Sequence, residues 1–377
     1  MNIVADRNMP LVTELFQDFG TVTLVDGRAL GPDQLKHADV LLVRSVTQVN
    51  RDLLDESAVR FVGSATAGYD HIDLAYLAGR GIPCALASGA NADSVVEYVL
   101  AAICLQPQFL QTLFKGGTLG IVGYGHVGRR LAEAAQILGA NTKVFDPYVD
   151  CGHYASSLDD VLACDVISLH CELSKTGRFP SWHLLDKKRL DGLHHRQLVI
   201  NAARGGVIDN HALRERLLQP DAPTVVLDCW EGEPAIDEAL VPLVAVATPH
   251  IAGYSYDAKV RGTSMLRQAV ACHLGFEIDT FRLTNDSHLK LRASIDVCSG
   301  LSDLLANVYC IEIDDANLRS AMREARPMSG AHWFDQLRRD YPIRRELRGT
   351  RVHAEVASEA VQRLQQCFQL QLSGRNC

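Results

Sequence analysis

A glycine-rich turn between an apolar strand and a helix constrains the fold of this chain more than any other feature. Residues 119–128 read LGIVGYGHVG, so three glycines with GxGxxG spacing follow directly after an apolar run. Apolar residues then recur on one helical face as far as Gly139, a residue type that commonly ends helices. The next apolar segment, 142–146, ends in Asp146, about where a dinucleotide-binding fingerprint carries its acid.

Each part of this pattern has a physical role in holding a dinucleotide. Gly123 permits the tight turn, Gly125 lets the backbone approach a pyrophosphate, and Gly128 lets helix and strand pack closely. The amino terminus of the helix attracts the phosphates. Asp146 can accept hydrogen bonds from ribose hydroxyls and would repel a 2′-phosphate, so NAD is favoured over NADP. The alternative is a turn that binds nothing, with Asp146 as a surface acid.

Most of the chain up to about residue 253 alternates short apolar strands with helical segments. Such alternation indicates an α/β fold, with parallel sheets covered by helices on both faces. The expected strands are residues 2–6, 21–26, 40–44 and 60–63, and then 119–122, 142–146, 166–169, 198–201, 224–227 and 244–247. The second series is sufficient for a six-stranded doubly wound domain. A long apolar helix at 93–113, broken near Pro107, separates the two series.

The pattern changes after about residue 285. Residues 289–298 alternate apolar and polar side chains, which predicts a half-buried strand, and a helix is expected to begin within 302–305. Residues 352–370 mix strand-like alternation with an amphipathic helical pattern. We interpret this end of the chain as a separate small α+β domain.

Length and composition limit the classes of protein to consider. With 377 residues, the chain is expected to form two or three domains. Its net charge of −8 argues against a nucleic acid or an anionic membrane as the main partner. The 11 cysteines show neither CxxC pairs nor zinc-like spacing, so no metal site is expected. The first residues lack a signal-peptide pattern and no long apolar run occurs, which predicts a cytoplasmic protein.

Three later segments place polar side chains just after expected strands. They are NAARGG at 201–206, DCWEGEP at 228–234 and TPHIAG at 248–253. In a doubly wound sheet, ligands bind beyond the carboxyl ends of the strands. Arg204, Glu233 and His250 would therefore converge on one crevice beside the nicotinamide.

This set of side chains suits the oxidation of a hydroxyl group next to a carboxylate. The guanidinium of Arg204 can bind the carboxylate and the developing carbonyl. His250 can accept the hydroxyl proton, and Glu233 can orient its imidazole and raise its pKa. The alternatives are a solvated turn arginine, a loop acid and a core histidine. For any one residue alone the alternative would be favoured, and the joint pattern reverses that preference.

These segments resemble the D-isomer-specific 2-hydroxyacid dehydrogenase family, through the Arg–Glu–His order and the NxxRG and PHIAG contexts. The resemblance implies a doubly wound NAD-binding domain at 93–253. This domain would be inserted in a split substrate-binding domain of flavodoxin-like fold, made of residues 1–92 and 254–282. Residues 283–377 would form a C-terminal domain, which in family members that carry one serves homodimerisation.

Segments 42–50 and 62–73 further resemble the substrate loops of family members that oxidise a phosphorylated 2-hydroxy acid. By this resemblance, Ser45, Thr66 and Tyr254 contact the substrate. The implied NAD contacts are Gly123, Gly125, His126, Val127, Gly128, Asp146, Cys171, Ala202, Ala203, Arg204, Asp228 and Gly253. Cys171 stands where the family usually has threonine. A thiol is a poorer hydrogen-bond partner, which puts that contact in doubt.

A substrate phosphate requires cationic partners, and the sequence offers two candidates. Arg44 is the first, and its alternative is a salt-bridged arginine at a strand end. The second is the arginine-rich stretch 338–351, which could reach the active site of a neighbouring subunit or form a solvated face.

Two other functions stay open at this point. One is another D-2-hydroxyacid dehydrogenase, such as a phosphoglycerate dehydrogenase. The other is a binding protein that senses NAD(H), because such proteins can retain the Arg–Glu–His set. A turnover assay distinguishes the sensor from the enzymes.

Overall fold

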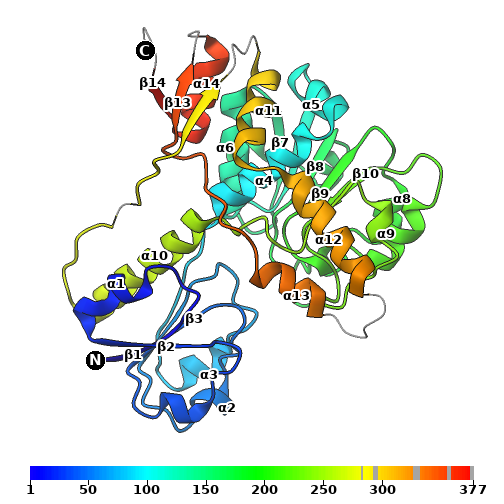
Figure 1. Cartoon of the computed structure of the whole chain (residues 1–377). Helices are drawn as coiled ribbons and strands as arrows, with labels where there is room; N and C mark the ends of the chain where they lie inside the picture. Colours follow the sequence, from blue (N-terminus) through cyan, green and yellow to red (C-terminus); the bar gives the residue numbers. More distant parts are fainter. Residues whose placement is uncertain (282, 292–295, 326–331, 355–357, 374–377) are drawn as a thin grey trace. The chain divides into compact units, whose positions relative to one another are not determined.

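The chain divides into two compact units in a computed structural model that describes residues 1–281, 283–291, 296–325, 332–354 and 358–373. The first unit consists of residues 1–92 and 255–284, and the second of residues 93–254 and 285–377. Both are α/β structures with parallel sheets (Figure 1), which confirms the predicted fold class.

The first unit is built on a five-stranded parallel sheet with the flavodoxin-like order β2-β1-β3-β4-β5. The strands are β1 (Asn2–Asp6), β2 (Thr21–Val25), β3 (Val40–Val43), β4 (Phe61–Ser64) and β5 (Cys84–Leu86). The helices are α1 (Val12–Phe16), α2 (Arg51–Leu54), α3 (Leu74–Gly79) and α10 (Tyr256–Leu274). Strand β5 was not expected from the sequence.

Alternate side chains of this sheet enter two separate cores, as the period of a strand requires. Leu42 of β3 packs in one core with Leu266 and Val270 of α10. Its neighbours Leu41 and Val43 pack in the other core with side chains of α2 and α3. Helix α10 thus completes the first unit, although the six-stranded sheet of the second unit lies between α3 and α10 in the sequence.

The second unit contains a six-stranded parallel sheet with the order β11-β10-β9-β8-β6-β7. The strands are β6 (Thr118–Val122), β7 (Asn141–Phe145), β8 (Val166–Leu169), β9 (Leu198–Asn201), β10 (Thr224–Leu227) and β11 (Val246–Ala247). The helices of this part are α4 (Ala92–Cys104), α5 (Pro107–Phe114), α6 (His126–Leu138), α7 (Leu158–Leu162), α8 (Lys187–Asp191) and α9 (Asn210–Leu217). The strand order reverses between β6 and β8, and this switch point is where a doubly wound sheet binds its ligand.

The C-terminal region forms a small three-stranded parallel sheet with helices. Its strands are β12 (His288–Leu291), β13 (Arg351–Ala354) and β14 (Gln371–Ser373), and its helices are α11 (Val297–Val308), α12 (Ile311–Ala325), α13 (His332–Arg339) and α14 (Glu359–Phe368). Short 3-10 helices elsewhere span Gln17–Phe19, Pro32–Leu35, Gly152–Tyr154, Gly205–Val207 and Val241–Leu243.

The expectation of one strand over 289–298 was wrong at its carboxyl end. Strand β12 ends at Leu291, residues 292–295 lie outside the described part, and α11 begins at Val297. The physical reason is a helix cap: the side chain of Asp296 accepts the backbone N–H of Ser299 at 2.9 Å. The helix expected at 302–305 is the middle of α11. Helices α12 and α13 were not expected from the sequence.

The C-terminal region shares its apolar cores with the NAD-binding part of the second unit. Leu364 and Phe368 of α14 pack with Leu131 and Leu138 of α6. Phe334 of α13 packs with α12 and the residues around β11. Buried apolar side chains of this region thereby belong to the same cores as those of the six-stranded sheet.

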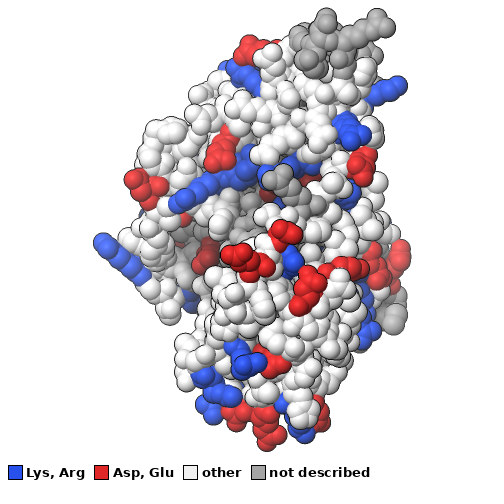
Figure 2. Space-filling model, turned by 90° about the vertical axis from the view of Figure 1, so that its left-hand side faces the viewer, with Lys and Arg blue, Asp and Glu red and all other residues white. Residues whose placement is uncertain are grey.

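The surface view in Figure 2 shows acidic and basic side chains intermingled on the face that it displays. Among the described residues, no helix combines the length and the apolar character that crossing a membrane requires.

Candidate active site

The glycine turn has the close contacts that a dinucleotide fingerprint requires. Gly123 follows β6 with a φ of +97°, and a Cβ there would lie 2.6 Å from the backbone nitrogen of Cys171. A Cβ on Gly128 would lie 1.9 Å from the carbonyl oxygen of Gly123. Neither position can carry a side chain without moving backbone. The turn is therefore pressed between α6 and the segment that follows β8.

Gly125, the middle glycine of the turn, leaves open space in front of a helix terminus. Gly125 is the residue before α6, and a Cβ built on it meets no other described atom within 4 Å. Asp146 lies directly after β7, where its Oδ2 accepts the N–H of Tyr124 at 2.7 Å. The acid thus faces the turn. Free backbone at a helix amino terminus, with an acid for the ribose beside it, fits NAD.

The other predicted NAD contacts lie near this turn or near the ends of neighbouring strands. His126 and Val127 begin α6, Ala202 and Ala203 follow β9, and Gly253 follows the His250 loop. Burial raises the pKa of the Cys171 thiol to about 12, so this residue carries no negative charge next to the turn. A neutral thiol is compatible with a bound pyrophosphate.

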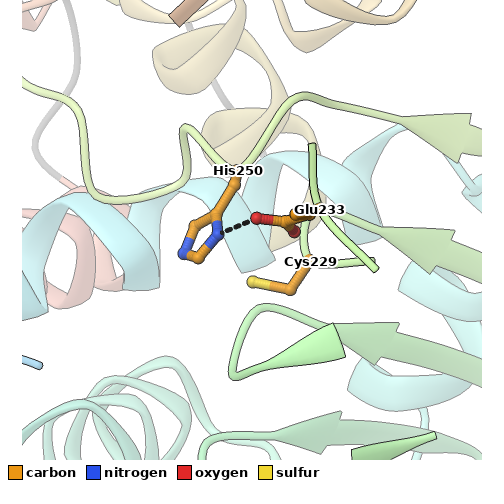
Figure 3. Close-up of side chains that lie close together, drawn as sticks. All are labelled: Cys229, Glu233 and His250. Atoms are coloured by element: carbon orange, nitrogen blue, oxygen red, sulfur yellow. Dashed lines mark hydrogen bonds and ion pairs between the residues drawn. The ribbon is translucent and has the colours of Figure 1, made fainter. Parts of the chain in front are cut away.

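The structure brings Glu233 and His250 into direct contact. Glu233 Oε2 lies 2.8 Å from His250 Nδ1, as Figure 3 shows. The second oxygen, Oε1, accepts the backbone N–H of Trp230 at 2.6 Å. A carboxylate held in this way assigns the proton to Nδ1 in the neutral imidazole and leaves Nε2 for a substrate.

The pair holds opposite charges. Burial by itself raises the pKa of Glu233, but His250, the Trp230 N–H and Arg338 outweigh it and lower that pKa. Burial by itself lowers the pKa of His250, but Cys229 and Glu233 outweigh it, and the pKa of His250 is well above its usual value. Because burial raises the pKa of the Cys229 thiol, we take Glu233 to be the anion that stabilises the imidazolium.

The buried carboxylate of Asp228 shapes the loop that carries His250. It accepts the backbone N–H groups of Ile251 at 2.8 Å and Ala252 at 3.0 Å, and the hydroxyl of Thr248 at 2.7 Å. His250 has a φ of +57°, a conformation that costs free energy for a residue with a side chain. These bonds offset that cost. The sequence suggested Asp228 only as an NAD contact, and that contact stays a prediction.

The loop that carries Arg204 packs backbone to backbone against the loop that carries Glu233. A Cβ on Gly205 would lie 1.9 Å from the carbonyl carbon of Trp230, so only glycine fits beside the loop that carries Glu233. Strands β9 and β10, which precede these loops, are parallel neighbours. Arg204 Nη1 donates to the Ala203 carbonyl at 2.8 Å.

Arg338 is a site residue whose place the sequence did not reveal. Its Nη2 donates to Tyr254 Oη at 2.9 Å, and its charge contributes to the lowered pKa of Glu233. The only sequence signal was its membership of the arginine-rich stretch, for which a neighbouring subunit's site or a solvated face was considered. The structure places Arg338 against Tyr254 of its own chain, with its charge near Glu233.

The position of Arg344 contradicts both interpretations of the arginine-rich stretch, a neighbouring subunit's site and a solvated face. Its side chain is buried, with the residue only 5% exposed, and it donates to the Ser94 hydroxyl and the Ala252 carbonyl. The guanidinium also lies 4.2 Å from the ring centroid of Tyr309. Arg344 is thus a structural anchor between the C-terminal region and the loop after His250.

Cys229 is a second residue that the sequence analysis did not single out. Its Sγ donates to the Ala203 carbonyl at 3.4 Å. The donor atoms of Cys229, Glu233 and His250 all lie within 4.8 Å of one another, a grouping that could hold a metal ion. Two of these atoms are engaged in the Glu233–His250 hydrogen bond, which is the arrangement a base and its orienting carboxylate require.

The predicted substrate residues of the first unit follow adjacent strands of its sheet. Ser45 is exposed after β3, and Thr66 follows β4, where its hydroxyl lies 2.7 Å from that of Ser64. Arg44 Nε lies 3.1 Å from the buried carboxylate of Asp6. This ion pair is the strand-end alternative considered for Arg44, and a role in phosphate binding stays a prediction.

Comparison with known families gives two matches along the chain. Residues 93–252 match the family described as "D-isomer specific 2-hydroxyacid dehydrogenase, NAD binding domain". This match confirms the prediction of NAD as the cofactor. Residues 284–367 match a "Domain of unknown function (DUF3410)".

Solved structures of related fold include two NAD complexes. They are a D-lactate dehydrogenase from Aquifex aeolicus (TM-score 0.61, 21% identity, 73% of this chain and 96% of that one) and a 3-phosphoglycerate dehydrogenase from Entamoeba histolytica (TM-score 0.59, 22% identity, 75% and 99%). At this level of identity, the likeness shows the fold alone.

Curated relatives are more similar and extend over nearly the whole chain. Erythronate-4-phosphate dehydrogenases of Marinobacter nauticus and Pseudomonas fluorescens are each 43% identical, and each alignment covers 96% of this chain and 97% of the relative. The chain therefore belongs to the D-isomer-specific 2-hydroxyacid dehydrogenase family and shares nearly its full length with the erythronate-4-phosphate dehydrogenases of that family.

Proposed function

We propose that this protein oxidises 4-phospho-D-erythronate at C2, with NAD, to 2-oxo-3-hydroxy-4-phosphobutanoate in the biosynthesis of pyridoxal phosphate. The observation that carries the proposal is the Glu233–His250 pair, held at 2.8 Å in the same unit as the NAD turn. The names of the curated relatives support the choice of substrate.

His250 is the base in this mechanism. Its Nε2 accepts the proton of the C2 hydroxyl, and Glu233 stabilises the imidazolium that forms. The Asp228 carboxylate keeps the His250 loop in the conformation that this transfer needs. Because the pKa of His250 lies well above its usual value, the neutral base that oxidation needs becomes abundant only as the pH rises.

Arg204 supplies the positive charge of the mechanism. Its guanidinium binds the substrate carboxylate and the oxygen at C2, where carbonyl character develops. The cofactor, when bound, accepts the hydride from C2. The turn Gly123–Gly128 and Asp146 would hold it. We further propose that Ser45, Thr66, Tyr254 and Arg44 contact the substrate.

A turnover assay tests the proposal. Protein, NAD and 4-phospho-D-erythronate are mixed, and NADH fluorescence is followed, with D-3-phosphoglycerate and D-lactate as comparators. A parallel sample contains a 2-oxo acid acceptor and is analysed for products, in case NADH stays bound. We expect preference for phosphoerythronate and loss of turnover in His250→Ala.

Other outcomes of this assay point to the alternatives. Preference for a comparator would retain the mechanism and replace the substrate. NAD binding without turnover of any compound would support the NAD(H)-sensing function instead.

We also propose that the protein is a cytoplasmic homodimer that associates through residues 283–377. Light scattering of the full chain tests the dimer, and a mass of one chain at micromolar concentration would contradict it. Fractionation of cells tests the compartment.

A further inference from the structure

Arg338 places a cation of the C-terminal region against the catalytic residues of the same chain. Its Nη2 donates to Tyr254 Oη at 2.9 Å, and the guanidinium carbon lies 5.6 Å from the centroid of the Tyr254 ring. Tyr254 is four residues after His250, and Arg338 is near enough to Glu233 to contribute to its lowered pKa. The guanidinium thus lies against the segment that follows His250.

Most of the hydrogen-bonding capacity of this guanidinium is unused within the described part of the chain. A guanidinium has five N–H donors. One of them is bonded to Tyr254, and Asp335 lies 3.8 Å from Nη1, too far for a hydrogen bond. The Nε atom is buried and has no acceptor among the described residues. Asp335 provides an ion pair at 3.8 Å but no hydrogen bond, so the guanidinium keeps N–H donors that can bind another anion.

The position of Arg338 is set by packing and by a hydrogen bond, which suits a binding residue. Its side chain is 20% exposed, so it is largely removed from water while one side stays accessible. Helix α13 is fixed by Phe334, which is fully buried in a core shared with Leu318 and Met322. Tyr254 then holds the end of the side chain. Such pre-organisation reduces the entropy lost when a ligand binds.

We propose that Arg338, oriented by Tyr254, binds the phosphate group of the substrate and so selects a phosphorylated hydroxy acid. The inference rests on the proposed function and adds a specificity-determining residue to it. In the proposed mechanism Arg204 and His250 bind the carboxylate and the C2 hydroxyl, so the phosphate needs a separate cation. Arg44, the other candidate, is already paired with the buried carboxylate of Asp6. Arginine binds phosphate oxygens in pairs through its planar fork. A hydroxy acid without the phosphate offers no second anionic group to this fork.

The test compares substrates with and without the phosphate. The wild type, Arg338→Met, Arg338→Lys and Arg339→Met are each assayed with 4-phospho-D-erythronate and with D-erythronate. Arg339 is the matched control, because it is a neighbouring arginine of the same helix but is exposed. Thermal unfolding and NAD titration of each variant show whether it folds.

We expect Arg338→Met to raise KM for phosphoerythronate about ten- to a hundredfold, because a charge-assisted pair of hydrogen bonds to the phosphate is lost. KM for D-erythronate should stay close to that of the wild type. Arg338→Lys should recover part of the loss, and Arg339→Met should resemble the wild type. A change in the electrostatics of Glu233 would instead appear in kcat for both substrates.

Two results overturn the inference while leaving the proposed function intact: an unchanged KM for phosphoerythronate in Arg338→Met, or equal losses for the two substrates. If the wild type oxidises neither compound, the proposed function fails. Calorimetric titration of the NADH complex with inorganic phosphate then decides the subsite. Binding that Arg338→Met abolishes supports it, and binding that is absent or unaffected overturns it.

Discussion

Glu233 Oε2 lies 2.8 Å from His250 Nδ1, while the other oxygen of the same carboxylate accepts the N–H of Trp230. Both oxygens of Glu233 are therefore used as acceptors. The imidazole is fixed in one orientation, with Nε2 left for the hydroxyl of a substrate. The arrangement also holds a charge on the imidazole at neutral pH, because the pKa of His250 is well above its usual value.

The first prediction concerns the dependence of the reaction on pH. Oxidation requires the neutral imidazole, so kcat/KM for oxidation should rise with pH through a pKa above the ordinary histidine value of about 6.5. Reduction of the 2-oxo acid requires the imidazolium and should fall over the same range. Initial rates in both directions between about pH 6 and pH 10 measure this dependence. Parallel profiles in the two directions would contradict the assignment of His250 as base.

The second prediction is that Glu233→Gln impairs the reaction without loss of fold. The amide has one acceptor oxygen in place of two, so it cannot serve both Trp230 and His250. We expect kcat to fall by about 10²- to 10⁴-fold and the pKa of the base to move down. Glu231→Gln is the control, because Glu231 bonds to His183 and Asn210 rather than to His250. Similar losses in the two variants would count against the pair.

The third prediction separates two glycines of the NAD turn. Gly125→Ala adds a methyl group in open space in front of α6, so it should weaken NADH binding about tenfold or more while Tm of the free protein stays unchanged. Gly123→Ala should also lower Tm, because its Cβ would meet the Cys171 backbone and its φ is +97°. Fluorescence titration and thermal unfolding check both. A stable Gly125→Ala variant with normal NADH affinity would refute the proposed cofactor position.

The fourth prediction is a relaxed choice of cofactor in Asp146→Asn. The asparagine oxygen can still accept the Tyr124 N–H, so the glycine turn should keep its shape, and only the exposed N–H of Tyr148 loses its acceptor. Removal of the negative charge should lessen the repulsion of a 2′-phosphate. We expect the ratio of kcat/KM for NAD over NADP to fall about tenfold or more. An unchanged ratio would mean that another group excludes NADP.

The fifth prediction is that Asp228→Asn destabilises the loop of His250. The Asp228 carboxylate accepts three hydrogen bonds and is only 1% exposed, and an amide would turn one acceptor into a donor facing a donor. The free energy of unfolding should fall by about 1–3 kcal/mol, and kcat should fall with it. Denaturant unfolding and steady-state kinetics measure the two effects. Full stability would show that the loop does not depend on this carboxylate.

Much of the fold and the core of the site follow from local sequence pattern. Strands β8, β9 and β10 have the bounds expected from their apolar runs, and the helix break at Pro107 separates α4 from α5 as expected. The glycines at 123, 125 and 128 could be interpreted because each demand is local: a turn, an open backbone and a close contact. The contact between Glu233 and His250 could be expected because parallel strands end at one edge of a sheet, whereas the joint catalytic role of Arg204, Glu233 and His250 stays a prediction.

Other features have no local signature, because they depend on segments that meet only in the folded chain. In the sequence, Asp228 is one more acid after a strand. Only the packed loops show that its carboxylate accepts the backbone N–H groups of the two residues after His250. Arg338 and Arg344 belong to one arginine-rich stretch, yet one is bonded to Tyr254 and the other is buried against Ser94. The local period of a helix or strand says which side chains share a face. What that face meets is decided by the burial of apolar surface between distant segments, and here that burial places one arginine against Tyr254 and the other against Ser94.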